Sequence, residues 1–213
     1  LVGSEMCIRD SALAERLLSA DDRGDLVLLP SFGDFFLDPM MALASPYSGA
    51  CVSYGPRFMS RESAADFWNG SVCEASLKLD LVHSNNFWCP AGFTSTRVVY
   101  TLYDLGFVID PLWTTEANRL GCFNGMFRAA AYADWIVAIS ENSAREFREI
   151  FPHFPAERIK VIYPCSRFDD STQNGSRPHS IGDIESEKFW LSVGTIEPRK
   201  TQKMLLQAYA RYL

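Results

Sequence analysis

Short apolar segments of strand length alternate with amphipathic helical segments along most of this 213-residue chain. The apolar segments run with few polar interruptions, which is typical of strands buried on both faces of a parallel sheet. This alternation predicts an α/β fold, with helices packed on a doubly wound, mainly parallel, Rossmann-like sheet. In chain order, the predicted strands are Asp25–Pro30, Ala50–Tyr54, Leu79–His83, Arg97–Tyr103, Trp135–Ile139 and Arg158–Tyr163.

Two helices between these strands have clear start signals. Thr115 and Ser140 precede helical patterns and are suitable N-caps, because their hydroxyls can accept from the free amides of a first turn. Weaker helical patterns cover Ser11–Ser19 and Ser60–Leu77. The inward positions predicted from apolar spacing are Leu120, Phe123, Phe127, Ala130 and Ala131 in the first helix and Ala144, Phe147 and Ile150 in the second.

Composition excludes several classes of protein. A net charge of −6 and a pI near 5.1 argue against nucleic acid as a partner, since phosphate backbones favour basic surfaces. No apolar run is long enough to predict a membrane-spanning helix. The six cysteines contain no C-x-x-C pair and the three histidines lie far apart, so we expect reduced, buried thiols and no metal centre.

The segment Phe189–Lys200 contains the most specific chemical signal. An apolar run meets a Gly-Thr turn, Pro198 follows at a suitable first helical position, and then come Arg199 and Lys200. Two cations at a helix N-terminus are unfavourable unless an anion lies there. Free amides together with Arg and Lys therefore predict a phosphate site, and the alternative is a solvated first turn.

The string Val193–Lys200 resembles the opening of the donor-binding domain in retaining GT-B glycosyltransferases of the group 1 (family 4) type. The resemblance implies that Gly194, Thr195, Arg199 and Lys200 bind the diphosphate of a GDP- or UDP-linked sugar. It also implies metal-independent and cofactor-free transfer of a mannose-like sugar to a glycan or lipid-linked glycan. A cytoplasmic enzyme in peripheral contact with the inner face of the membrane would fit this activity.

The resemblance extends from Asp80 to the end of the chain and includes Thr101–Leu105. The family has a histidine beside the reacting sugar where this chain has Tyr103, which is followed by Asp104. Tyrosine is a poor base at neutral pH because its usual pKa is about 10. Tyr103 is thus interpreted either as a site residue or as an ordinary aromatic, and Asp104 either as a contact to the ligand or as a turn former.

Two further family strings imply residues on the acceptor side of the site. His83 matches a second strand-end histidine, so we expect His83 and Tyr103 to face the same ligand-binding edge of the sheet. Ala138–Ser143 matches a string that assigns Ser140 and Glu141 to the acceptor side. Structural roles remain the alternatives, because a lone histidine is commonly structural and helix capping alone explains Ser140.

The chain divides into four predicted parts. Residues 1–10 lack the pattern of a secretory signal and resemble the ends of translated environmental reads, so we expect a non-native leader. Residues 11–165 form the N-terminal Rossmann-like domain and 166–187 a polar linker. Residues 188–213 match the first strand and helix of a second Rossmann-like domain. We expect a full-length protein with about 150 further residues, without which the fragment is inactive.

Two other functions fit parts of the pattern. One is a stand-alone Rossmann-like binding module without catalytic activity. The other is a dinucleotide-dependent enzyme, which the sequence favours less because no Gly-x-Gly-x-x-Gly follows an early strand.

Overall fold

The computed structural model describes residues 78–85, 88–164, 190–194, 196 and 200–212, and shorter stretches at 13, 17, 26–28, 52–54, 66 and 74–76. Four parallel strands form one sheet in the order β3-β4-β5-β6, and β1 pairs in parallel with β2 in a second sheet. The predicted α/β fold with a parallel sheet is therefore confirmed, and each of the six strands predicted before residue 165 has a counterpart. These are β1 (Leu26–Leu28), β2 (Val52–Tyr54), β3 (Leu81–Asn85), β4 (Arg97–Leu102), β5 (Trp135–Ala138) and β6 (Ile159–Val161).

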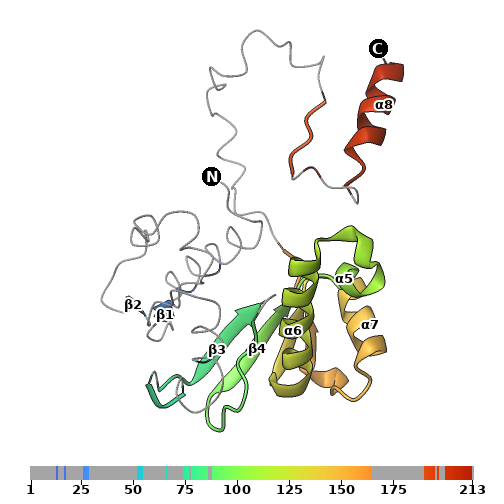
Figure 1. Ribbon diagram of the computed structural model, residues 1–213. Helices are drawn as coiled ribbons and strands as arrows, with labels where there is room; N and C mark the ends of the chain where they lie inside the picture. Colours follow the sequence, from blue (N-terminus) through green and yellow to red (C-terminus); the bar gives the residue numbers. More distant parts are fainter. Residues whose placement is uncertain are drawn as a thin grey trace.

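Two helices cover one face of the four-stranded sheet. α6 (Glu116–Tyr132) connects β4 to β5, and α7 (Glu141–Ile150) connects β5 to β6. Because both crossovers step in the same direction along the sheet, the right-handed rule puts both helices on one face, and Figure 1 shows them side by side. Beneath them lie the buried side chains of alternate strand residues, including Val98, Tyr100, Leu102, Ile136 and Ala138.

Phenylalanine rings join the two helices to the turn that follows α7. Phe147 is fully buried and its ring lies 4.9 Å from Phe151 and 5.5 Å from Phe154, centroid to centroid. Phe127 of α6 meets Phe151 edge to face at 5.0 Å. Such edge-to-face pairs add to the stabilisation that burial provides, so this cluster fixes α7 against α6.

The buried face of α6 differs from the predicted one. Gly125, Met126, Ala129 and Ala130 are buried, whereas Phe127 is 43% exposed and Leu120 and Ala131 are also exposed. The prediction followed apolar residues at helical spacing, three of which are bulky. The helix instead turns its small residues and Met126 toward the sheet, which allows a close approach of backbones, and Phe127 reaches sideways to Phe151. Ala130 is correctly predicted, and Phe123 is partly buried against the core.

α7 follows its sequence pattern closely. Ser140 is the N-cap, and its hydroxyl accepts from the Ser143 amide at 3.1 Å. Ala144 and Phe147 are buried and Ile150 packs against the core, as predicted. On the outer face, Arg145 approaches Glu149 at 3.8 Å. Thr115 caps α6 in the predicted way, accepting from the Asn118 amide at 3.4 Å.

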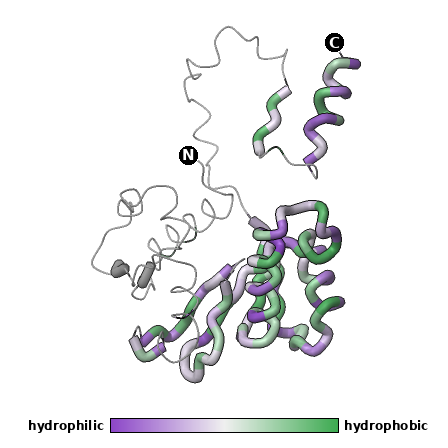
Figure 2. Tube along the Cα trace, viewed as in Figure 1, coloured by the Kyte–Doolittle hydropathy of each residue, from purple (hydrophilic) through white to green (hydrophobic). Residues whose placement is uncertain are grey.

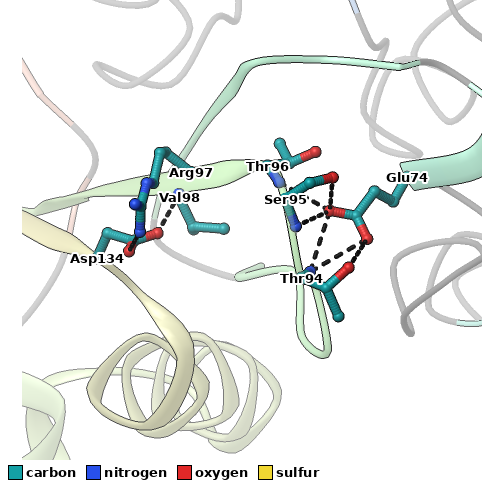
Figure 3. Close-up of polar contacts among 7 residues, drawn as sticks. All are labelled: Glu74, Thr94, Ser95, Thr96, Arg97, Val98 and Asp134. Carbon is teal, nitrogen blue, oxygen red and sulfur yellow. Dashed lines mark hydrogen bonds and ion pairs between the residues drawn. The ribbon is translucent and has the colours of Figure 1, made fainter.

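Two carboxylates bind the chain where it enters the strands β4 and β5, as Figure 3 shows. Glu74 accepts hydrogen bonds from the backbone amides of Thr94, Ser95 and Thr96 at 2.7–3.1 Å and from two of their hydroxyls. These bonds to the charged form hold the pKa of Glu74 far below its usual range. Asp134 accepts from Arg97 at 2.8 Å and from the Val98 amide at 2.9 Å, which ties the start of β4 to the start of β5.

The C-terminal part departs from two predictions. Residues 190–193 do not form a strand, and α8 (Gln202–Tyr212) begins four residues after Pro198. Trp190 instead stacks on α8, with its ring 5.3 Å from Tyr209 and 5.6 Å from Tyr212. Hydrophobic and hydrophilic residues alternate along α8 (Figure 2). The predicted leader and linker lie outside the described residues.

Candidate functional site

The carboxyl ends of the four parallel strands lie at one edge of the sheet. In β3 and β4 the arrowheads point the same way, and α5 (Gly106–Ile109) lies beyond them (Figure 1). Open α/β sheets bind their ligands outside this edge. The polar segments that leave it are the end of β3, the Tyr103–Asp104 pair after β4 and the N-terminus of α7 after β5. These three segments form the candidate site.

Asp104 is exposed and begins the turn into α5. Its Oδ1 accepts a hydrogen bond from the Gly106 amide at 3.0 Å. A side chain at position 106 would have its Cβ 3.2 Å from Asp104 Oδ1 and 3.2 Å from the Trp113 ring, which is tighter than ordinary contact. The turn-forming interpretation of Asp104 is thus confirmed, and the same turn presents its carboxylate at the carboxyl edge.

Tyr103 lies immediately after β4 and is half-buried, while its hydroxyl oxygen is fully buried. The expectation that its side chain faces the ligand edge stays a prediction, and the buried part of the side chain is its hydroxyl oxygen. The exposed carboxylate at this strand end belongs to Asp104.

His83 is exposed and lies in the middle of β3 rather than at its end, because the strand runs two residues further than predicted. Its Nε2 is 2.7 Å from the Oγ1 of Thr101, which is 8% exposed on the neighbouring strand. Asn85 ends β3 and pairs in register with Thr101. Asn85 was not among the predicted site residues, although a polar residue after Leu81–Ser84 was the available signal.

The N-terminus of α7 brings together the two predicted acceptor-side residues and one that was missed. Glu141 is exposed in the first turn and Ser140 is half-buried. Ser143, which is 4% exposed, donates its hydroxyl proton to the Tyr103 carbonyl at 2.6 Å. The signal for Ser143 was a hydroxyl at the third helical position, where a capping box has an acid.

Of the two cysteines in the described residues, Cys89 is buried and Cys122 is half-buried. Burial raises the pKa of the Cys89 thiol to about 12 and that of Cys122 to about 11, with Asp104 as the second cause for Cys122. Thiols with such pKa values stay protonated near neutral pH and are poor nucleophiles and metal ligands. In the part of the chain that the structure describes, no cluster of three His, Cys, Asp or Glu side chains is arranged for a metal ion.

The predicted phosphate turn is only partly described, since Thr195 and Arg199 lie outside the described residues. Gly194 and Lys200 lie together: a Cβ on Gly194 would be 3.0 Å from the Lys200 Nζ. Gly194 has a φ of 149°, a conformation that side chains disfavour. Lys200 precedes α8 and is not in its first turn, so the predicted helix start at Pro198 is wrong.

A parallel sheet with helices packed on one face, and with exposed polar groups at its carboxyl edge, defines a Rossmann-like α/β domain of the ligand-binding kind. The model of one family, Glycosyltransferase Family 4, matches residues 14–165. The chain belongs to this family, and the match begins well before Asp80, where the resemblance seen in the sequence faded. No curated protein matches the chain. Among the described helices, none is both long and apolar enough to cross a membrane.

Proposed function

We propose that this protein transfers a mannose-like sugar from a nucleoside-diphosphate sugar to a glycan or lipid-linked acceptor. The observation that carries the proposal is the family match over residues 14–165, which includes the four-stranded sheet and both covering helices. Membership supports glycosyl transfer in general. The identity of the sugar, the GDP or UDP carrier, the acceptor and retention of the anomeric configuration are the finer parts of the proposal.

In this proposal, the turn that contains Gly194, Thr195, Arg199 and Lys200 binds the donor diphosphate. The close approach of the Lys200 amine to Gly194 supports it, because a glycine there leaves space for the amine at the turn. When the bond from the sugar to the diphosphate breaks, negative charge grows on the leaving phosphate. The planar guanidinium of Arg199 and the ammonium group of Lys200 can neutralise that charge without a metal ion.

The carboxyl edge of the first domain supplies the acceptor side. The new bond forms between the anomeric carbon and an acceptor oxygen as the bond to the diphosphate breaks, and the leaving phosphate oxygen can take the acceptor's proton. The exposed carboxylates of Asp104 and Glu141 can accept hydrogen bonds from sugar hydroxyls. His83 and Ser140 add further polar contacts on this side, and Tyr103 contributes its main chain, because its hydroxyl is buried.

A lipid-linked acceptor is supported by the segment that follows Asp104. Ile109, Leu112 and Trp113 lie on it as exposed apolar side chains, and Leu112 is 85% exposed. Apolar side chains beside a sugar-binding edge suit an acceptor with an apolar anchor. This feature also supports the proposed peripheral contact with a membrane.

A donor panel tests the proposal. The protein expressed from its complete gene is incubated with GDP-mannose, UDP-glucose and UDP-N-acetylglucosamine, with and without a lipid extract, and release of the nucleoside diphosphate is measured. We expect release from one donor, stimulation by the extract and no loss of activity in EDTA. Release from none of the donors would contradict the proposed function, and abolition by EDTA would contradict its metal-independent part.

A further inference from the structure

The hydroxyl of Ser143 connects α7 to the chain segment that leaves β4. The last backbone bond between β4 and the β5 side is donated by the Ile139 amide to the Leu102 carbonyl, at 3.1 Å. The next carbonyl along the chain, that of Tyr103, accepts instead from the Ser143 hydroxyl at 2.6 Å. The Ser143 hydroxyl is therefore the donor at the first carbonyl beyond the backbone hydrogen bonds of the sheet, and it fixes the peptide unit between Tyr103 and Asp104.

Counting protons gives the direction of the neighbouring bonds. Ser143 has one hydroxyl proton, and the Tyr103 carbonyl can only accept, so that proton points to Tyr103. The 3.0 Å contact between the hydroxyls of Ser140 and Ser143 must then be donated by Ser140. The Ser143 amide in turn donates to the Ser140 oxygen at 3.1 Å. Bonds aligned in one direction polarise and strengthen one another.

Asp104 is consequently held at two points although its side chain is exposed. Ser143 fixes its main chain from one side, and the Gly106 amide fixes its Oδ1 from the other at 3.0 Å. Trp113 packs so closely on Gly106 that no Cβ fits there without a shift. An exposed surface carboxylate normally samples many rotamers, whereas this one is oriented in advance.

We propose that Ser143 is a positioning residue for glycosyl transfer. Its hydroxyl sets the Tyr103–Asp104 peptide so that the Asp104 carboxylate accepts a hydrogen bond from a hydroxyl of the transferred sugar or its acceptor. The ligand class at this point is thus a sugar with a free hydroxyl. This inference rests on the proposed function. It assigns a part in that function to the buried Ser143, which lies forty residues along the chain from Tyr103.

The first test compares Ser143→Ala with Ser143→Thr in the protein expressed from its complete gene. The assay uses whichever of GDP-mannose, UDP-glucose and UDP-N-acetylglucosamine the wild type turns over. We expect Ser143→Ala to lower kcat about tenfold, the cost of one neutral hydrogen bond, with the donor KM unchanged. Ser143→Thr keeps the hydroxyl and should recover most of the rate. Ser95→Ala is the matched control, since it removes a 2.9 Å hydroxyl bond at the opposite edge of the sheet and should leave kcat unchanged.

The second test separates positioning from general stability, and it holds even if threonine fits poorly at position 143. In an Asp104→Asn background, Ser143→Ala should have little further effect on kcat, because both changes disrupt the same contact. If the two effects multiply fully, Ser143 does not act through Asp104 and the inference is overturned. An active wild type whose kcat is unaffected by Ser143→Ala overturns the inference alone. A wild type that turns over no donor overturns the proposed function and the inference together.

Discussion

The carboxylate of Glu74 lies 2.7 Å from the backbone amide nitrogen of Thr96, twenty-two residues further along the chain. Together with the amides of Thr94 and Ser95, this contact fixes the helical residues at 74–76 to the loop that enters β4. The relationship is local in space and distant in sequence, so neither segment alone predicts it. It gives the start of β4 a defined position before the strand reaches the candidate site at its other end.

Replacing Glu74 by Gln should loosen this loop. The amide group of Gln offers one acceptor oxygen where the carboxylate has two, and its NH₂ would oppose the backbone donors. We expect faster amide hydrogen exchange at residues 94–96 and a lower melting temperature at neutral pH. Exchange rates equal to those of the wild type would contradict the role of Glu74.

The same contact should respond to pH in one direction. Because the folded-state pKa of Glu74 is lowered, its stabilisation is fully present above the usual carboxyl pKa and is lost as the pH falls through the folded value. Exchange protection at residues 94–96 should therefore persist through the range where free glutamates titrate. Loss of this protection near pH 4 in an otherwise folded protein would show that the carboxylate is not held as described.

Met126 and Phe127 are adjacent on α6 and test its orientation. Met126 is fully buried, so Met126→Ala should lower the free energy of unfolding by about 2–5 kcal/mol. Phe127 is 43% exposed, and Phe127→Ala should cost less than Met126→Ala despite removing more atoms. Urea unfolding of both variants measures the two values. A larger loss of unfolding free energy in Phe127→Ala than in Met126→Ala would support the buried face predicted from the sequence, which contains Phe127.

Arg97 and Asp134 form an ion pair whose two members are not equivalent. Arg97→Ala removes a highly exposed guanidinium and should change the free energy of unfolding by about 0–1 kcal/mol. Asp134→Ala also removes the acceptor of the Val98 amide and should cost about 1–3 kcal/mol. Thermal or urea unfolding of the two variants gives the comparison. Equal losses would mean that the Val98 contact adds nothing.

Cys89 and Cys122 should resist alkylation in the native protein. The reactive species is the thiolate, and burial raises the pKa values to about 12 and about 11. Brief treatment with iodoacetamide at pH 7.5, followed by peptide mass mapping, should leave Cys89 unmodified and Cys122 nearly so. Full modification of both after unfolding in urea is the control, and rapid labelling of native Cys89 would contradict its burial.

Strand and helix order could be predicted because it depends on local periodicity. The α/β alternation, the caps at Thr115 and Ser140 and the inward positions Ala144 and Phe147 all follow from spacing within one segment. The buried face of α6 could not be predicted in this way. Where the helix lies close to the sheet, small residues such as Gly125 and Ala129 fit better than bulky apolar ones.

The candidate site was predictable in its position and less so in its contacts. The resemblance of Thr101–Leu105 to a family string identified Tyr103 and Asp104, but the burial of the Tyr103 hydroxyl depends on tertiary packing that the string does not contain. Ser143 was missed because its partner lies forty residues away. The helix start after Lys200 was misassigned because Pro198 suits a first helical position whether or not a helix begins there.

The central claim is that this member of Glycosyltransferase Family 4 binds a nucleoside-diphosphate sugar through its basic turn, and calorimetry tests it most directly. The protein expressed from its complete gene is titrated with GDP-mannose and UDP-glucose, alongside Lys200→Ala and an Arg199→Ala/Lys200→Ala double variant. Each charge-assisted contact contributes about 1.5–3 kcal/mol, so Lys200→Ala should weaken binding of the preferred donor by roughly one to two orders of magnitude, and the double variant by more. Equal donor affinity in the wild type and the double variant would contradict the account, because the turn would then be solvated and without a role in binding.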